Sequence, residues 1–280
     1  LYHNKTEWIV HSARQDIESL YHLSKRLPSS LFDTQIAASL LNYPVQISYQ
    51  ALTEILQDVY LDKSHTRYDW TKRPLPKDVV EYALDDVRYL LPNFKKLKHE
   101  LTISKKIQWL DEETRFLLDQ ELYEPSIEQI CYKTKGLSRL DNKFQVKAIK
   151  LAAWRESNAQ QKNKPRKWIM SDEKLLDYAC GKSKLSTRSK KLFDDFVKES
   201  SETLSLTELL TPQKPLTSSE KNKKNELQRL INSIAEAYNL RPEVISTSKS
   251  LIRFMRGDLS APLCNGWRSK LFNKEELNAK

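Results

Sequence analysis

The chain has 280 residues, of which 39% are hydrophobic and 30% charged, and only 4 glycines. These values are typical of a helix-rich chain of two or three domains, and no stretch reaches the ~18 to 20 apolar residues of a membrane span. The first residues, LYHNKTEWIV, lack the basic and apolar segments of a signal peptide, so a cytoplasmic location is predicted. The three cysteines have no CxxC spacing, which argues against a zinc site or a disulfide framework.

The net charge of +10 is unevenly distributed. Residues 1–141 carry 19 Lys/Arg and 21 Asp/Glu, a balance of −2, whereas residues 142–280 carry 28 and 16, a balance of +12. This division favours chemistry in the front half and polyanion binding in the rear half. The alternative is a basic solvated surface without a partner.

The front half alternates short apolar runs with helical patterns. A strand is predicted in residues 7–13, a helix in 14–27, and a second strand at Leu31 and Phe32 before a helix that Asp33 or Thr34 caps. This order indicates a parallel α/β sheet. A helix over 47–60, a polar and aromatic loop over 61–76, and a helix over 76–101 interrupted near Pro92 follow.

The rear half has only helical patterns. No strand is predicted beyond about residue 104, and helices are predicted over 144–163, 171–180, 187–202, 224–240, 244–258 and 265–272. Residues 211–225, rich in Pro, Thr, Ser and Lys, are predicted to be a linker. Trp168 and Trp267 are assigned to the core.

Three residues of the front half are candidates for chemistry. Tyr82 and Asp86 lie at i and i+4, so a helix places them on one face, apart from an apolar stripe expected to pack inward: Val79, Ala83, Val87 and Leu90. Asp16 follows a predicted strand and lies at the start of a helix. There its carboxylate interacts favourably with the helix dipole or reaches a metal. Taken singly, each has an ordinary structural explanation.

Taken in order, the motifs are more specific. Asp16 after a strand, Asp33 in LFDTQIAA, the RYDWTKRPL loop and then EYALDD resemble ribonuclease D of the DEDD exonuclease superfamily, in the branch with tyrosine in its last motif. LAAWRESNAQQKNKPRKWIMSDEKLLDYA resembles a first helicase-and-ribonuclease-D C-terminal (HRDC) domain, and NGWRSKLF the end of a second. The resemblance implies an α/β, ribonuclease H-like exonuclease domain and two small all-α HRDC domains, predominantly helical overall. The expected boundaries are 1–118 for the exonuclease portion, 119–141 for a connector, and 142–212 and 218–280 for the HRDC domains.

The resemblance also implies the chemistry. Asp16 and Asp86 become metal-binding aspartates, and Tyr82 orients the attacking water. Two-metal hydrolysis uses cations ~3.5 to 4 Å apart, and hard oxygen ligands suit Mg²⁺ or Mn²⁺. The expected function is a 3′–5′ exoribonuclease that trims structured RNAs such as tRNA precursors, with no membrane and no obligate protein partner. A DNA-directed exonuclease and a non-catalytic nucleic-acid-binding protein are the alternatives.

The sequence departs from the family at one point. The family's first motif, Asp-x-Glu on a strand, has no counterpart before Asp16, and Asp119-Gln120-Glu121 is excluded by its order and its helical surroundings. The chain is therefore expected to be N-terminally truncated and inactive as it stands.

Nucleic-acid contacts are expected in two places. The loop over 61–76 interleaves Lys63, Arg67 and Arg73 with Tyr68 and Trp70, which suits phosphates and stacked bases; the alternative is a loop anchored to the core with solvated charges. In the rear half a basic cluster is expected to bind RNA: Arg155, Lys164, Arg166 and Lys167. Asp33 is interpreted as a structural helix cap.

Overall fold

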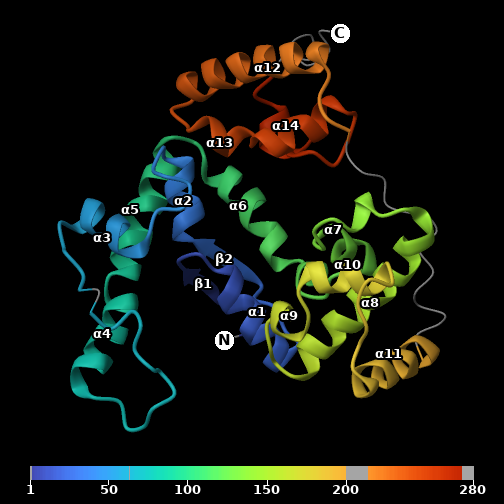
Figure 1. Cartoon of the computed structure of the whole chain (residues 1–280). Helices are drawn as coiled ribbons and strands as arrows, with labels where there is room; N and C mark the ends of the chain where they lie inside the picture. The colour runs from blue at the N-terminus through green and yellow to red at the C-terminus, as the bar shows by residue number, and fades with distance from the viewer. Residues whose placement is uncertain (1, 63, 200–213, 273–280) are drawn as a thin grey trace. The chain divides into compact units, whose positions relative to one another are not determined.

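The computed structural model describes residues 2–62, 64–199 and 214–272. It forms two compact units, one made of Leu1–Gln120 with Leu216–Lys280 and the other of Glu121–Pro215. The second unit is therefore inserted, in sequence, between two parts of the first. Figure 1 gives the element labels used below.

The first unit is built around two parallel strands. β1 (Glu7–Val10) pairs with β2 (Ser30–Asp33), with Trp8 opposite Leu31, and α1 (Arg14–Ser24) connects them. Ile17 and Tyr21, one turn apart on α1, are buried. The predicted parallel strand–helix–strand unit is thus present, and within the described ranges no further strand occurs.

Five more helices complete the front part of this unit. They are α2 (Thr34–Leu40), α3 (Tyr49–Gln57), α4 (Lys77–Arg88), α5 (Leu90–Ile103) and α6 (Ile107–Arg115). The predicted interruption is real, with Tyr89 between α4 and α5. The inward stripe on α4 is wrong beyond its first turn, since Val79 is 1% exposed but Val87 is 60% exposed. Helical spacing identifies an apolar face, but burial of that face requires a neighbouring segment. Among the described residues, none covers Val87.

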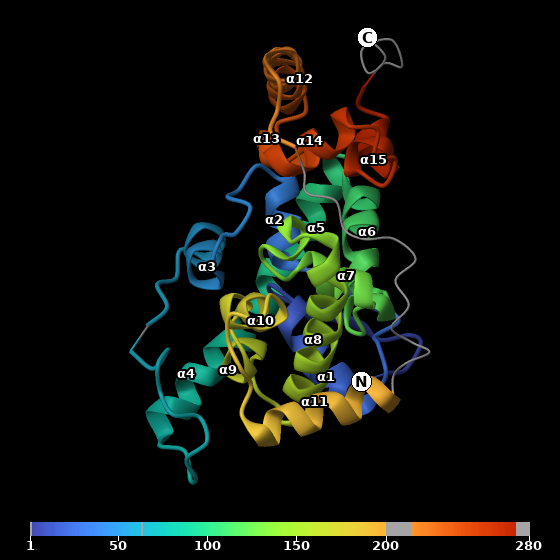
Figure 2. The ribbon, with the colours of Figure 1, turned by 45° about the vertical axis from the view of Figure 1, so that its right-hand side comes forward.

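The C-terminal helices share the core of the front part. α12 (Ser218–Ala237), α13 (Pro242–Ile245), α14 (Ser248–Met255) and α15 (Gly266–Ser269) lie at the ends of α2 and α6 in both views (Figures 1 and 2). Trp267, 2% exposed, stacks on Trp109 of α6 at 4.4 Å between ring centroids. Arg268 pairs with Glu113 of α6 through both carboxylate oxygens. The assignment of Trp267 to the core is confirmed.

Lys106 joins the two sequence segments of the first unit. Its side chain is buried, and its ammonium donates to the carbonyl oxygens of Leu40 (2.9 Å), Tyr238 (2.8 Å) and Asn239 (3.2 Å). Burial lowers the pKa of this ammonium. Three carbonyl acceptors thus satisfy the charge, which forms no ion pair with any described carboxylate.

Part of the predicted linker is helical. α12 begins at Ser218 because Thr217 accepts from the Glu220 amide while the Glu220 carboxylate accepts from the Thr217 amide. This capping box satisfies two of the amides that a helix start leaves free. Composition alone therefore misplaced the boundary, and the spacing Thr-x-x-Glu was the signal.

The second unit is all helical within its described residues. α8 (Asn142–Gln161) contacts the others, which are α7 (Ile127–Tyr132), α9 (Arg166–Ile169), α10 (Asp172–Ala179) and α11 (Thr187–Glu199). Ser171 caps α10, as predicted.

Short 3-10 turns occur in both units, at Phe116–Leu118, Gln120–Leu122, Leu137–Arg139 and Pro262–Cys264. The chain is thus predominantly helical with a small parallel sheet, and among the described helices none is long and apolar enough to cross a membrane.

Candidate active site

Asp33, at the end of β2, organises the turn that leads to Asp16. Its carboxylate is 2% exposed and accepts from the amides of Gln35 and Ile36, which caps α2 as predicted. It also accepts from Ser12 (3.0 Å) and Ala13 (2.7 Å) at the start of α1. One buried side chain therefore fixes two helix starts at the carboxyl ends of adjacent parallel strands.

Asp16 lies in the first turn of α1, close to this buried carboxylate. Desolvation raises the pKa of Asp16, and the charge of Asp33 raises it further. Among the described residues, the Asp16 carboxylate has no hydrogen-bond or ion-pair partner. Its negative charge is therefore not compensated by the protein part that the structure describes.

Asp86 on α4 is in a similar situation. Desolvation raises its pKa, with a further contribution from the neighbouring carboxylate of Asp85. The Asp85 carboxylate has a cation, because it accepts from Arg88 at 2.6 Å. Asp86 has no cation partner in the described ranges, so only one of the two adjacent carboxylates is neutralised by an ion pair.

Tyr82 lies one turn before Asp86 and is held by the loop over 61–76. Its hydroxyl is 3.2 Å from Thr66 Oγ1, and its ring lies 5.8 Å from His65 and 6.0 Å from Trp70 between centroids. His65 in turn pairs with Asp78 on α4 at 3.2 Å. The loop thus restricts the phenol that was predicted to act beside Asp86.

His11 and Tyr49 lie between the Asp33 turn and α4. His11 hydrogen-bonds Thr34 Oγ1 (2.9 Å) and the Ile47 carbonyl (3.0 Å), and its pKa is lowered by burial. The Tyr49 ring meets His11 edge-on at 5.7 Å, and its hydroxyl donates to the Asp85 carbonyl at 2.9 Å. Burial raises the pKa of Tyr49 to about 12. Sequence reasoning missed Tyr49, because nothing in its helical pattern distinguishes it.

The basic residues of the loop differ in their roles. Arg73 donates to the carbonyl oxygens of Trp70 (2.9 Å) and Lys72 (2.7 Å), so it shapes the loop. Arg67 is exposed, and Trp70 is 38% exposed beside Tyr82. Lys63 lies outside the described residues. The loop therefore combines an arginine that shapes its backbone with an exposed aromatic ring.

The basic cluster of the second unit requires one correction. Arg155 is fully buried and donates to Asp172 (2.7 Å), the Met170 carbonyl (3.1 Å) and Thr134 Oγ1 (3.2 Å). A buried guanidinium offers no surface to RNA, so Arg155 is a structural residue. A single apolar stripe on α8 did not show that the arginine beside Trp154 also points inward.

The rest of this cluster is at the surface. Lys164 and Lys167 are exposed, and Arg166 is partly exposed and donates to the Lys133 carbonyl. Trp168 between them is 76% exposed, so its assignment to the core is wrong. α9, which carries it, is a single short turn that leaves the indole on the solvent side.

The two carboxylates have the chemistry of metal ligands. Asp16 and Asp86 are exposed, hard oxygen donors without protein cations among the described residues, which suits a divalent ion. The described part of the chain contains no group of three or more His, Cys, Asp and Glu that could hold a metal ion. It thus offers two fitting ligands at separate positions.

Residues 1–102 match the protein family described as 3′–5′ exonuclease, which gives the class of the protein. Ribonuclease D of Bartonella henselae is 34% identical over 285 aligned positions, which cover 95% of this chain and 70% of that protein. The chain belongs to the ribonuclease D family of 3′–5′ exoribonucleases. Ribonuclease D of Sphingobium indicum is 41% identical over 172 positions, covering 61% of this chain and 44% of that protein.

A solved structure shows the same fold. The crystal structure of Escherichia coli RNase D, described as an exoribonuclease involved in structured RNA processing, superposes with a TM-score of 0.79 at 23% identity. The match covers 99% of this chain and 80% of that one. Membership of this family implies dependence on a divalent metal ion.

Proposed function

We propose that Asp16 and Asp86 bind divalent metal ions, Mg²⁺ or Mn²⁺, and that Tyr82 orients the water that attacks the last phosphodiester of an RNA 3′ end. One observation carries this proposal: both aspartates are exposed, neither carboxylate has a hydrogen-bond or ion-pair partner among the described residues, and partial desolvation raises the pKa of each. Asp85, by contrast, is neutralised by Arg88 and serves as the internal comparison. Two ions, as in two-metal hydrolysis, are part of the proposal.

The chain's own residues perform the positioning. Asp33 holds the turn before Asp16, and Thr66 with Trp70 holds the Tyr82 phenol. A phenol is protonated at neutral pH, so Tyr82 directs a water through its hydroxyl and does not act as the base. When bound, the metal lowers the pKa of that water and stabilises the leaving oxygen.

The proposed substrates are structured RNAs such as tRNA precursors. The +12 charge of residues 142–280 and the exposed Trp168 among Lys164, Arg166 and Lys167 support RNA binding there. The cytoplasmic location remains a prediction. A DNA-directed exonuclease and a binding protein without catalysis are the alternatives that the same assays separate.

The test is release of single nucleotides from a 3′-labelled RNA with Mn²⁺. In a form of the protein that releases nucleotides, Asp86→Ala abolishes release, and Tyr82→Phe leaves a small fraction, since misorienting a water costs less than losing a metal. Glu81→Gln, on the same helix and paired with Arg88, is the control and leaves release unchanged. Parental rates in both site variants would refute the assignment.

We expect residues 1–280 alone to be inactive, because their described part holds no group of three or more metal ligands. The same assay on residues 1–280 tests this. Mn²⁺ binding is measured separately by calorimetry, because the two aspartates contribute to binding whether or not turnover occurs. Robust release by residues 1–280 that is lost in Asp86→Ala would show that other residues complete the metal site. A labelled DNA of the same sequence measures the preference for RNA.

A further inference from the structure

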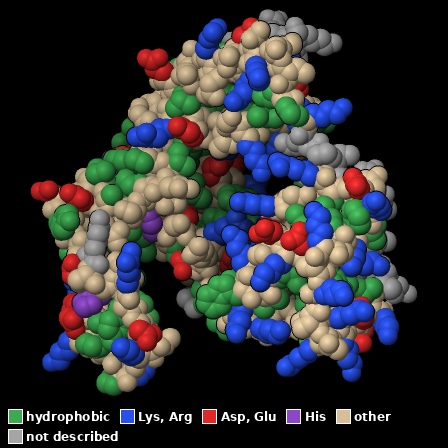
Figure 3. Space-filling view, viewed as in Figure 1, with side chains coloured by type: hydrophobic (Ala, Val, Ile, Leu, Met, Phe, Trp, Pro, Cys, Tyr) green, Lys and Arg blue, Asp and Glu red, His purple; other side chains and the backbone are tan. Residues whose placement is uncertain are grey.

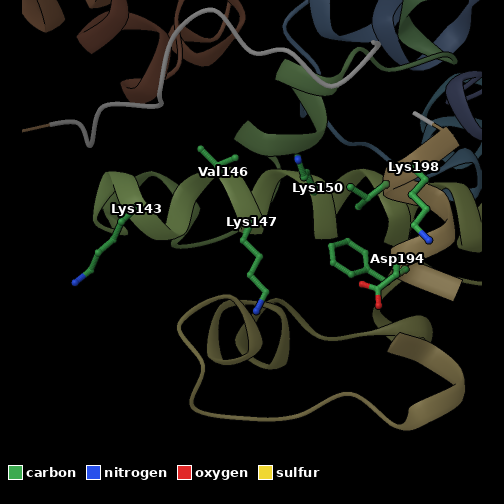
Figure 4. A pocket seen from close by; sticks show the side chains of 8 residues that line it. Lys143, Val146, Lys147, Lys150, Asp194 and Lys198 are labelled. Carbon is green, nitrogen blue, oxygen red and sulfur yellow. The ribbon is translucent and has the colours of Figure 1, made fainter. Parts of the chain in front are cut away.

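A groove between α8 and α11 lies on the second unit, and its lining includes none of the basic residues around α9. Its volume is about 540 Å³. Figure 4 shows Lys143, Val146, Lys147 and Lys150 along α8, with Asp194 and Lys198 on α11. The α8 positions follow one another at i, i+3, i+4 and i+7, so they share one face of that helix.

The groove is strongly basic, with four lysines against a single aspartate. In the part of the chain that the structure describes, none of the four ammonium groups forms an ion pair. Lys147 lines the groove, and its ammonium donates to the Tyr178 carbonyl at 3.2 Å and lies over that ring. Figure 3 shows Lys and Arg side chains spread over the visible face of this unit.

The floor of the groove is apolar and rigid. Phe193 is 6% exposed and is fixed edge-on against Trp154 (5.8 Å) and Tyr178 (6.3 Å). Val146, 51% exposed, lines the same groove. Apolar and aromatic surfaces beside lysines are what nucleic-acid grooves use, because ribose and base faces contact them while phosphates meet the cations.

We propose that this groove binds the backbone of structured RNA, with its lysines on phosphates and Val146 and Phe193 beneath a ribose or base. The helix axis rises by about 10 Å between Lys143 and Lys150, which exceeds one phosphate group and fits a run of backbone. The inference rests on the proposed function for RNA as the ligand class. It adds a binding surface distinct from Lys164, Arg166 and Lys167.

The experiment measures fluorescence anisotropy of a labelled tRNA with the full chain in EDTA, so that cleavage is excluded. The groove variant carries four changes: Lys143→Gln, Lys147→Gln, Lys150→Gln and Lys198→Gln. The control removes the same charge from the same unit outside the groove: Lys182→Gln, Lys184→Gln, Lys190→Gln and Lys191→Gln. A triple variant carries the groove changes at Lys143, Lys150 and Lys198 but retains Lys147, whose bond to Tyr178 contributes to packing. Melting curves verify that all variants fold.

We expect the groove variant to bind about ten-fold more weakly, with a salt slope reduced by about 0.7 to 0.9 for each phosphate that a lysine no longer neutralises. The triple variant shows most of this loss, and the control shows little. Equal losses in groove variant and control, or none in either, overturn the proposal. Displacement of RNA by polyglutamate at equal charge concentration also overturns it, in favour of an acidic protein ligand. Failure of the parental chain to bind any RNA refutes the proposed function instead.

Discussion

Replacing Asp33 with alanine should destabilise the first unit far more than loss of an ordinary helix cap. The carboxylate accepts four backbone amides at 2.7 to 3.3 Å while 2% exposed. Loss of the α2 cap costs about 1 kcal/mol, and each bond to Ser12 and Ala13 about 1.5 kcal/mol or more, because hydrogen bonds to a charged group contribute more than neutral ones. The expected loss in the free energy of unfolding is therefore about 4 kcal/mol.

Urea denaturation followed by tryptophan fluorescence measures this loss. With a urea dependence of about 2 kcal/mol per molar, the midpoint should fall by about 2 M. Thr217→Ala removes the exposed cap of α12 in the same unit and should cost only about 1 kcal/mol. A midpoint for Asp33→Ala no lower than that of Thr217→Ala would refute the reasoning. The midpoint of Asp33→Asn, which keeps one acceptor oxygen, should lie between those of Asp33→Ala and Thr217→Ala.

Three further predictions follow from single contacts. Thr66→Val removes the hydroxyl partner of Tyr82 and should lower the turnover rate several-fold without changing KM, with no added loss in a Tyr82→Phe background. Asp172→Ala leaves buried Arg155 unpaired and should cost about 3 to 5 kcal/mol in thermal denaturation; a loss below about 1 kcal/mol would contradict this. Burial raises the pKa of Asp172, but the hydrogen bond and charge of Arg155 outweigh it and hold the pKa below its ordinary value. The stability contributed by this pair is fully present above the pKa of Asp172 in the unfolded chain, ~3.9, and is lost as the pH falls through its lower pKa in the folded protein. Asp172→Asn should flatten this pH dependence in acid titrations. Lys106→Met orphans three carbonyl groups and should accelerate hydrogen exchange in the last turn of α12, whereas unchanged exchange would exclude a structural role for the ammonium.

Local sequence patterns predicted the features that local chemistry determines. The cap at Asp33 was predictable because an aspartate between an apolar strand and a helical pattern is well placed to accept the first amides of the helix. The parallel strand pair and the cap at Ser171 follow from similar short-range rules. The i, i+4 spacing also placed Tyr82 and Asp86 one turn apart on one helix.

Other features depend on contacts between distant segments. The exposed indole of Trp168 and the buried guanidinium of Arg155 reverse what hydrophobicity alone predicts, because tertiary neighbours decide burial. The approach of Thr66 to Tyr82 depends on how the loop folds back, which no spacing encodes. Metal-ligand roles remain proposals, since the described residues supply two separate carboxylates.

The bonds of Lys106 and Glu113 have a consequence for biosynthesis. Lys106 binds a carbonyl that is synthesised 132 residues later, and Glu113 an arginine that is synthesised 155 residues later. A ribosome adding ~5 to 20 residues per second needs at least several seconds to deliver those partners, whereas residues 121–215 are synthesised before α12. The inserted unit can therefore fold first, while the ends of α2 and α6 stay uncovered until the last helices arrive. Nascent chains stalled at about residue 215 should accordingly expose this apolar end to chaperones.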